Sequence, residues 1–212
     1  MDEYVLKINE FMFNQIKHIQ NPSFLEFGVK EGRSTKFFLD ICKRNNGKLF
    51  SIDVDDYSNL FDDPNWTFIK SRDDNFEFLK KKLPPKFDVI YLDSLHEATH
   101  VEKIFYYYYN FLNIGGKFYI DDISWLPYLK NSYRNNFYCE INNKETFERL
   151  LSIYSSNEEN FDIDFNFTSS GLCKIKKKRD ELNKRKKIET REFSIKNILK
   201  KFIYKNKKWN LI

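Results

Sequence analysis

The sequence predicts an α/β domain in which a mostly parallel sheet carries helices on both faces. Short apolar runs alternate with longer amphipathic segments along most of the chain, as strands and helices do when they follow one another. Glycine, proline and asparagine separate these segments. Acidic residues stand at or beside the ends of four apolar runs, which is the edge where parallel sheets bind their ligands.

The expected elements follow one another in a regular order. Residues 3–19 have a nearly helical spacing of apolar side chains, and Asn21-Pro22 ends this helix. Five strands are expected at 24–27, 48–52, 66–69, 87–92 and 117–120. Helices are expected at 34–44, 73–83 and 98–112, with Gly115-Gly116 capping the last of them, and a further helix at 144–154. A terminal hairpin is expected from 161–167 and 171–175.

These elements divide the chain into three parts. We expect an N-terminal helix in residues 1–22, one α/β domain in residues 23–175 and a basic helical tail in residues 176–212. A chain of 212 residues suffices for one domain with a core, and 41% hydrophobic with 32% charged residues exclude a disordered chain.

The chain shows no sign of a membrane span, a signal peptide or a disulfide framework. No apolar run approaches the roughly 18 to 20 residues that a span needs. Met1 to Tyr4 lacks the basic start of a signal peptide. Cys42, Cys139 and Cys173 lie too far apart for a metal motif. We therefore expect a cytoplasmic protein with reduced thiols.

A basic tail follows an acidic body. Residues 174–208 contain 16 Lys and Arg against 4 Asp and Glu, which leaves 20 basic and 27 acidic residues elsewhere. We interpret the tail first as an amphipathic helix that packs on the body or on a partner subunit of a homo-oligomer. Contact with an anionic membrane surface or an acidic glycan is the second interpretation. Nucleic acid is the least favoured partner, because no nucleic-acid-binding signature is present.

Two aromatic segments carry no assigned chemistry. Phe105 to Tyr109 point all round a helix, so we expect core packing for most of them. Trp125 to Tyr138 follows the last acidic pair and is interpreted either as a substrate lid or as a plain aromatic loop.

A glycine turn after the first strand indicates a cofactor that contains a nucleoside. Gly28 lets the chain turn without a side chain in the way, and Gly32 lets the backbone approach a ligand where the next helix begins. The spacing E-x-G-x-x-x-G, which starts at Glu26, differs from the G-x-G-x-x-G of dinucleotide binders. Asp53 ends the second strand, where a carboxylate accepts hydrogen bonds from ribose hydroxyls.

These motifs resemble those of the class I S-adenosylmethionine-dependent methyltransferases over residues 23–122. Phe24 to Thr35 is similar to the family's first motif, and Ser51-Ile52-Asp53 is similar to its second. Phe87 to His96 resembles the fourth-strand signature of a subgroup that methylates small molecules, sugars included. Leu112 to Asp122 resembles the fifth-strand motif, with Ile114 where proline is more usual. The resemblance implies a Rossmann-like, mostly parallel seven-stranded sheet that ends in the antiparallel hairpin.

The same resemblance implies roles for the residues of the cofactor site. The methionine end of S-adenosylmethionine would be held by Glu26, by the turn Gly28 to Gly32 and by Ser34. Asp53 would hold the ribose. Asp73 or Asp74 would face the adenine, although the alternative role of an N-cap of the following helix is equally consistent with their position.

Three carboxylates predict a metal site at the same edge. Asp93, Asp121 and Asp122 end two strands that should lie side by side, and their charges repel one another unless a cation lies between them. Oxygen ligands favour Mg²⁺. The catechol-type O-methyltransferases and some relatives that act on sugars place Mg²⁺ on carboxylates of similar spacing, although the catechol type usually has Asn at the position of Asp122. Without a metal, Asp93 and Asp122 would bind substrate hydroxyls.

His96 is interpreted as the base that removes a proton from the acceptor, with Asp93 as its catalytic partner, because histidine side chains ordinarily titrate at about pH 6.5. His100 is interpreted as a surface or metal-shell histidine. The leading hypothesis is a Mg²⁺-assisted O-methyltransferase that acts on a small hydroxylated acceptor such as a sugar or glycan unit. The alternatives are a metal-independent methyltransferase, with RNA among its substrates, and a non-catalytic Rossmann-like binding module.

Overall fold

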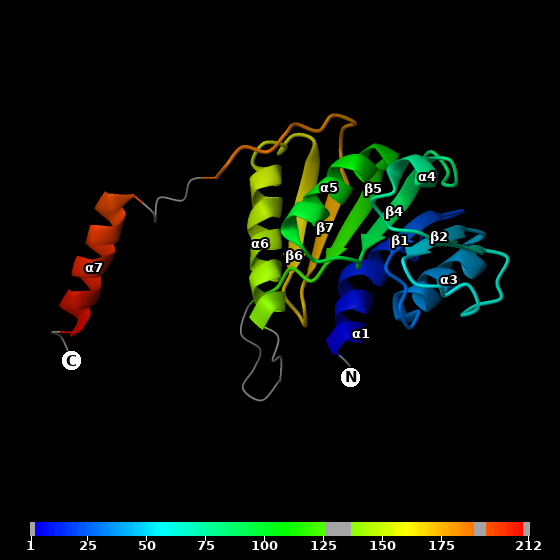
Figure 1. Cartoon of the computed structure of the whole chain (residues 1–212), viewed down its shortest axis with the longest axis horizontal. Helices are drawn as coiled ribbons and strands as arrows, with labels where there is room; N and C mark the ends of the chain where they lie inside the picture. The colour runs from blue at the N-terminus through cyan, green and yellow to red at the C-terminus, as the bar shows by residue number, and fades with distance from the viewer. Residues whose placement is uncertain (1–2, 126–136, 189–193, 210–212) are drawn as a thin grey trace.

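The chain folds around one seven-stranded sheet (Figure 1). The computed structural model describes residues 3–125, 137–188 and 194–209. The strands lie in the order β3-β2-β1-β4-β5-β7-β6. Strands β1 to β5 run parallel to one another, and β7 pairs antiparallel with β5 and β6. The mostly parallel sheet with an antiparallel terminal hairpin, as predicted from the sequence, is confirmed.

The strands agree closely with the expected segments. Their bounds are β1 Ser23–Phe27, β2 Lys48–Asp53, β3 Trp66–Lys70, β4 Phe87–Leu92, β5 Leu112–Asp121, β6 Phe161–Asn166 and β7 Leu172–Lys177. The order of the strands reverses at β1, so that β2 and β4 lie on either side of it. The chain therefore leaves β1 and β4 side by side at their carboxyl ends, where ligands bind in sheets of this kind.

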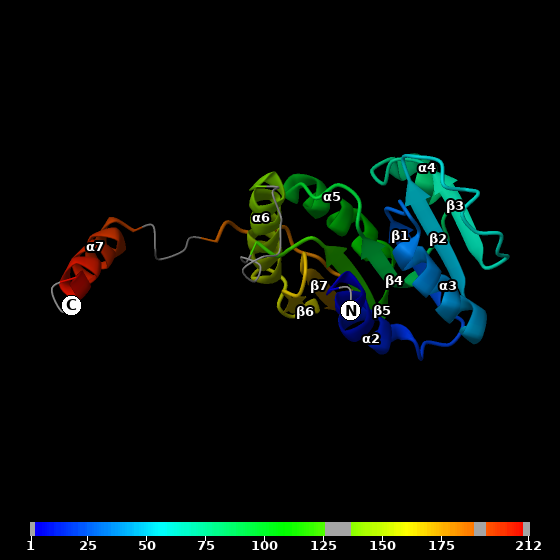
Figure 2. The same cartoon turned by 90° about the horizontal axis from the view of Figure 1, so that it is seen from below.

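One face of the sheet is covered by the N-terminal helical segment and by α3 (Figure 2). The segment comprises α1 Glu3–Lys7, a π-helix η1 Ile8–Phe13 and α2 Asn14–Ile16, and α3 is Arg33–Asn45. Ile8, Met12 and Ile16 are fully buried. Because each buried side chain of this size contributes roughly 1.5–3 kcal/mol, these three residues hold the N-terminal helical segment on the sheet.

The other face is covered by α4, α5 and α6. These are Phe76–Lys80, Ala98–Tyr108 and Phe137–Tyr154, and a 3₁₀ turn, η2 Tyr109–Phe111, follows α5. Val101, Ile104 and Phe105 of α5 pack into a cluster with side chains of β1, β4 and β5. The core packing expected for Phe105 to Tyr109 is confirmed, because three of these residues are fully buried and the other two pack against the same cluster.

Two expected boundaries were wrong. The helix expected at 73–83 is reduced to α4, because Asp73 is held outside it by side-chain hydrogen bonds to Ser94 and His100. Gly115-Gly116 does not cap α5 but lies inside β5, which begins already at Leu112. The pairing of β4 with β5 shifts its register between Phe87 and Val89, and Gly115, with φ of +81°, is accommodated at this irregularity.

The basic tail differs from the first expectation for it. Residues 178–188 form no helix, and α7 spans Ile195–Trp209. Figures 1 and 2 show α7 apart from the sheet, and its apolar residues from Ile195 to Ile203 are more than half exposed. The first part of the tail does pack on the body: Tyr106 Oη donates to Asn183 O (2.9 Å), and Arg185 pairs with Glu102 of α5 (2.7 Å). Only α7 stands apart from the body, and its packing on a partner subunit stays a prediction. In the described parts of the chain, no helix has the length and apolar character that would let it cross a bilayer.

Candidate active site at the carboxyl edge of the sheet

The glycine turn after β1 is packed against the end of β4. Gly28 has φ of +90°, and a Cβ at this position would lie 2.0 Å from the carbonyl oxygen of Asp93. The Gly28 amide donates to Ile52 O of β2 (2.9 Å), and Asp93 N donates to Phe27 O (2.9 Å). Gly28 is therefore required for this close approach, since any side chain would separate the turn from β4.

Asp53 fastens the turn from the end of β2. Its Oδ2 accepts hydrogen bonds from the backbone amides of Val29 (2.7 Å) and Lys30 (3.4 Å), and its Oδ1 accepts one from Asp55 N (3.0 Å). Gly32, at φ +71°, is the N-cap residue directly before α3. The carboxylate predicted to hold a ribose thus lies beside the glycine turn, as the sequence spacing required, although its role in binding stays a prediction.

Glu26 lies beneath the turn and is fully buried. Three hydroxyl groups donate to its carboxylate: Ser34 to Oε1 (2.6 Å), and Thr35 (2.7 Å) and Ser51 (2.7 Å) to Oε2. These bonds join β1 to β2 and to the start of α3. The structure therefore gives Glu26 and Ser34 partners inside the protein, and the cofactor contacts expected for both stay predictions. Glu26 positions the turn from below.

Burial raises the pKa of Glu26 to about 7, although its three hydroxyl partners oppose the shift. Because the folded-state pKa lies above the unfolded value, this group stabilises the fold most below about pH 4.5, and that contribution is lost as the pH rises through 7.

We expect the Glu26→Gln variant to lose less stability than the wild type when the pH rises from 5 to 8. The difference should approach about 3 kcal/mol, because one pKa unit corresponds to about 1.4 kcal/mol. Urea unfolding at both pH values measures it, with Glu77→Gln on the exposed side of α4 as the control. If the two variants lose stability equally between these pH values, the carboxyl group of Glu26 is not the source of the effect.

The two acidic residues after β3 are in different surroundings. Asp73 is buried, and its Oδ2 lies within hydrogen-bond distance of Ser94 Oγ (2.5 Å) and His100 Nε2 (2.9 Å). Asp74 pairs with Arg72 and Lys103, which lower its pKa to about 2. Only Asp73 is linked to the end of β4, so it is the better candidate for the adenine, and His100 is a buried partner of Asp73 rather than a surface residue.

His96 stands between two carboxylates that come from different strand ends. Its Nε2 lies 3.6 Å from Asp93 Oδ1 and 3.5 Å from Asp122 Oδ2. All three side chains remain about a quarter to a third exposed, so an acceptor can reach them. Burial and the charges of Asp121 and Asp122 raise the pKa of Asp93 well above its ordinary value. This part of the edge therefore favours any positive charge that forms beside it.

Asp121 has a different partner from the one expected. Lys7, on α1, is buried and forms an ion pair with Asp121 Oδ1, and its ammonium group also donates to Ser170 Oγ (2.8 Å). The Tyr91 hydroxyl group donates to Asp121 Oδ2 (2.7 Å). Burial alone would raise the pKa of Asp121, but the Lys7 ammonium and these hydrogen bonds outweigh it and hold the pKa below its ordinary value.

The predicted magnesium ligands therefore do not form a ligand set. In residues 3–125, 137–188 and 194–209, no group of three His, Cys, Asp or Glu side chains is arranged to hold a metal ion. Asp93 and Asp122 face His96, whereas Asp121 is paired with Lys7. The Tyr91 hydroxyl group lies between Asp93 Oδ2 (3.2 Å) and Asp121 Oδ2 (2.7 Å), so it separates two of the carboxylates expected to share a cation. The sequence argument correctly required a compensating charge, but the fold supplies it from a side chain.

Sequence reasoning missed Lys7, Tyr91 and Tyr4. Lys7 and Asp121 are 114 residues apart, and nothing in the spacing of Lys7 distinguishes it from other lysines. The approach of Tyr4 to this edge is seen in its pKa, which is raised by burial and by Asp93 and Asp121. Tyr91 could have been found, because it alternates with Ile90 on β4 and so faces the side on which the N-terminal helix packs. The expected lid from Trp125 to Tyr138 falls largely outside the described residues.

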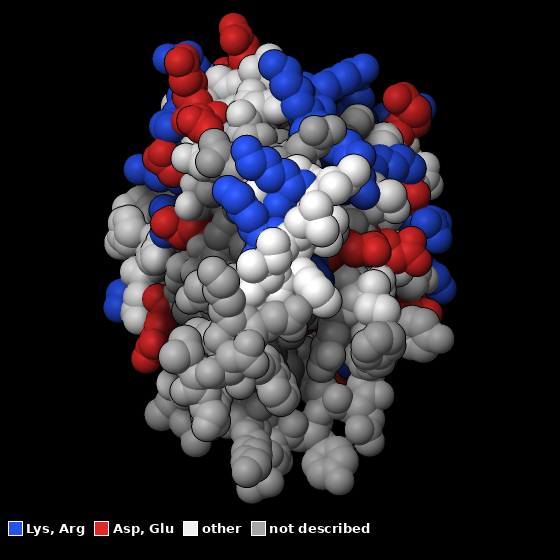
Figure 3. Space-filling model, turned by 90° about the vertical axis from the view of Figure 1, so that its left-hand side faces the viewer, with Lys and Arg blue, Asp and Glu red and all other residues white. Residues whose placement is uncertain are grey.

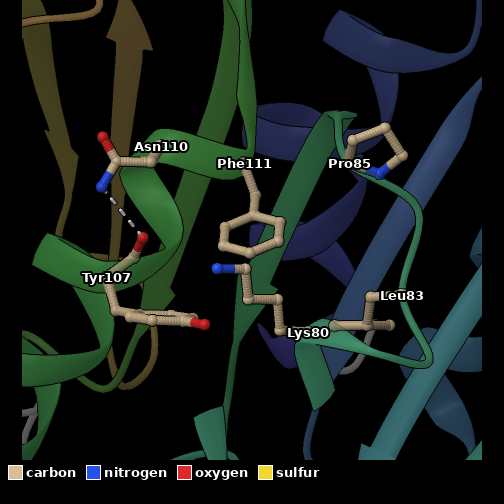
Figure 4. A pocket seen from close by; sticks show the side chains of 6 residues that line it. All are labelled: Lys80, Leu83, Pro85, Tyr107, Asn110 and Phe111. Carbon is tan, nitrogen blue, oxygen red and sulfur yellow. Dashed lines mark hydrogen bonds between the residues drawn. The ribbon is translucent and has the colours of Figure 1, made fainter. Parts of the chain in front are cut away.

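A hollow elsewhere on the molecule does not belong to this site. Lys80, Leu83, Pro85, Tyr107, Asn110 and Phe111 line a space of about 520 Å³ (Figure 4). These residues end α4 and α5 or lead into β4 and β5, so the hollow lies at the amino ends of these strands. The acidic residues lie at the opposite ends, and the lining of the hollow is mostly apolar.

The comparisons with known proteins agree with this arrangement. Residues 25–123 match a family model described as a methyltransferase domain. The sequence matches no curated protein significantly. MycE, a methyltransferase of the mycinamycin biosynthetic pathway solved with Mg, SAH and mycinamycin VI, is 18% identical, with a TM-score of 0.58 over 85% of this chain and 51% of the other. This chain thus spans about half the length of MycE.

Two further solved structures share the fold over more of their own length. The SAH-bound methyltransferase PaMTH1 of Podospora anserina is 15% identical, with a TM-score of 0.57 over 79% of this chain and 76% of the other. A protein of Staphylococcus aureus, whose assignment as a caffeoyl-CoA O-methyltransferase is provisional, is 15% identical, with a TM-score of 0.59 over 84% and 92%. At such identities these structures show a common fold, and residues 25–123 are similar in sequence to a methyltransferase domain.

Proposed function

We propose that the chain transfers the methyl group of S-adenosylmethionine to an oxygen atom of a small hydroxylated acceptor, such as a sugar or glycan unit. The observation that carries this proposal is the place of His96, partly exposed between Asp93 and Asp122 at the edge where the glycine turn lies. A base at this point can accept the proton of a hydroxyl group that attacks the methyl group.

The proposed reaction is one displacement. The acceptor oxygen forms a bond to the methyl carbon while the carbon–sulfur bond breaks, and the sulfonium leaves as the neutral thioether of S-adenosylhomocysteine. The hydroxyl proton passes to the imidazole of His96, and the imidazolium that forms is stabilised by Asp93 and Asp122. The remaining acceleration comes from holding the oxygen, carbon and sulfur in line.

A panel of acceptors tests the reaction class. The purified chain is incubated with S-adenosylmethionine and with monosaccharides, nucleotide sugars, catechols, amines or RNA, and release of S-adenosylhomocysteine is measured. We expect turnover with hydroxylated small molecules and a methyl ether as the product. Turnover with amines or RNA alone would overturn the assignment, and calorimetry that detects no cofactor binding would leave only the non-catalytic module.

We expect the His96→Gln variant to lose about 10²- to 10⁴-fold in kcat, which is the usual contribution of a general base. Its affinity for S-adenosylmethionine should stay within about twofold, because His96 contacts the acceptor side of the edge. Steady-state kinetics and calorimetry separate the two effects, and His18→Gln at an exposed position is the control. An unchanged kcat in His96→Gln would remove this histidine from the reaction.

We also propose that α7 contacts an anionic membrane surface. Ile195, Ile198, Leu199, Phe202 and Ile203 recur at helical spacing and are 51% to 79% exposed. The sequence of α7 contains six lysines and no acidic residue. In the view from the side on which α7 lies, Lys and Arg side chains stand beside uncharged ones (Figure 3). An apolar stripe with lysines beside it suits insertion among anionic head groups.

Vesicle sedimentation tests this contact. We expect binding to phosphatidylcholine vesicles that contain phosphatidylglycerol, weaker binding at high salt because the charges are screened, and little binding to phosphatidylcholine alone. Ile198→Glu with Phe202→Glu should abolish binding, and Ile114→Glu, which replaces an exposed apolar side chain on β5, should not. Absence of vesicle binding would overturn the membrane contact. A stable dimer that the two α7 substitutions dissociate would instead assign the apolar stripe to a second copy of the chain.

A further inference from the structure

We propose that Lys7 is a resident cation of the active site: it holds Asp121 by an ion pair, so that the acidic edge forms without a divalent metal, and it positions Asp122 beside His96. Lys7 is a positioning residue in this proposal. Its catalytic consequence rests on the proposed function, but its effect on metal binding does not.

Asp121 Oδ1 has no free lone pair. An ionised carboxylate has about four acceptor sites, two on each oxygen. Three donors meet Oδ1, namely Lys7 Nζ, the Asp122 amide at 2.8 Å and Ser170 Oγ at 3.4 Å, and Oδ2 accepts from Tyr91 Oη at 2.7 Å. A metal ion at Oδ1 would have to displace Lys7, and one at Oδ2 would meet a carboxylate whose charge the Lys7 ammonium already balances.

The burial of Lys7 is explained by its ion pair with Asp121. Its side chain is 1% exposed, and a buried ammonium group is costly unless it is paired. Ile8 and Met12, which follow it in the N-terminal segment, fix the helix on the sheet and thereby carry Lys7 to the end of β5. The pair therefore forms because the fold buries α1 at the carboxyl edge of the sheet. The positive charge of Lys7 is opposite to the negative charge of the aspartates at that edge.

Asp122 links the pair of Lys7 and Asp121 to His96. Asp122 has φ of +57°, which is uncommon for a residue other than glycine. Its amide donates to Asp121 Oδ1, the oxygen that Lys7 also binds, and to Gly171 O at 3.2 Å. In this conformation Asp122 Oδ2 lies 3.5 Å from His96 Nε2. Lys7 therefore orients the partner of the base through Asp121, although it does not touch the base itself.

Metal titration tests the inference directly. Calorimetry with Mn²⁺ and Mg²⁺ is performed on the wild type, on Lys7→Ala and Lys7→Gln, and on Lys17→Ala, which alters an exposed lysine of the same N-terminal segment. We expect no binding by the wild type or Lys17→Ala below millimolar metal, and at least tenfold tighter Mn²⁺ binding by Lys7→Ala, because Asp121 is then free. Lys7→Gln also removes the positive charge but leaves a polar side chain at this buried position, so it serves if Lys7→Ala does not fold.

Two results would overturn the inference. One is micromolar Mn²⁺ binding by the wild-type protein, and the other is a folded Lys7→Gln variant with no gain in Mn²⁺ affinity. A thermal shift of either Lys7 variant by Mn²⁺ but not of Lys17→Ala would support it.

Activity gives a separate measurement. We expect EDTA to leave wild-type turnover unchanged, and we expect Lys7→Gln to lose at least tenfold in kcat and to regain part of it with Mn²⁺. If no acceptor is turned over but the metal titration gives the expected result, the proposed function fails while the role of Lys7 stands. If EDTA abolishes wild-type turnover, the role of Lys7 fails while the proposed reaction stands.

Discussion

Replacing Gly28 with alanine is expected to destabilise the protein by about 4 kcal/mol and to abolish cofactor binding. The new Cβ would lie 2.0 Å from Asp93 O and 2.7 Å from Asp93 C, so the backbone of the turn or of β4 must move. Overpacking of this kind typically costs 1–3 kcal/mol, and a left-handed backbone adds roughly 1–2 kcal/mol for a residue other than glycine. The movement also displaces Asp93 and the amides that Asp53 binds.

Gly115 provides a matched control. It has φ of +81°, close to that of Gly28, but a Cβ at Gly115 would meet nothing within 4 Å. Gly115→Ala therefore carries the backbone strain without the steric clash, and we expect a loss of only about 1–2 kcal/mol with unchanged cofactor affinity. Urea unfolding and calorimetry with S-adenosylmethionine measure both quantities. Equal losses of stability in the two variants would show that the turn after β1 can move to accommodate a Cβ. Glycine at position 28 would then be required by its backbone conformation and not by the close approach to β4.

The glycine turn also shows why much of the fold could be predicted. Strand periodicity, the breaks between elements and the acid at the end of β2 are local signals, and each is expressed in the sequence within a few residues of the structure that it causes. The positions of Gly28, Asp53 and Asp93 follow from the rule that parallel strands end at the same edge. The bounds of β4 were predicted to the residue because an apolar run buried on both faces has clear ends.

The parts that were missed depend on contacts between distant segments. The three hydroxyl partners of Glu26 were not predicted, because they depend on how α3 packs over β1 and β2. The start of α4 was misplaced because Asp73 is held by Ser94 and His100, which lie on the far side of β4 in the sequence. Neither contact leaves a periodic signal, so no local pattern reveals it.

The ion pair of Lys7 and Asp121 is the most important contact that no local pattern revealed. We expect the two side chains to be strongly coupled in their contribution to the stability of the fold. Lys7→Met leaves the Asp121 carboxylate buried without its counter-ion, and Asp121→Asn leaves the Lys7 ammonium buried in the same way. Removing one partner of a buried pair typically costs 3–5 kcal/mol, and we expect a loss in this range for each single variant.

The double variant Lys7→Met/Asp121→Asn removes both charges and should recover most of the loss, with a coupling energy of about 3 kcal/mol. Urea unfolding of the four proteins at pH 7 measures the cycle. Losses that simply add would mean that each side chain stabilises the fold alone. A large coupling energy would show that each side chain depends on the other for its stability in the fold. The negative charge of Asp121 is then balanced by Lys7 before any ligand binds.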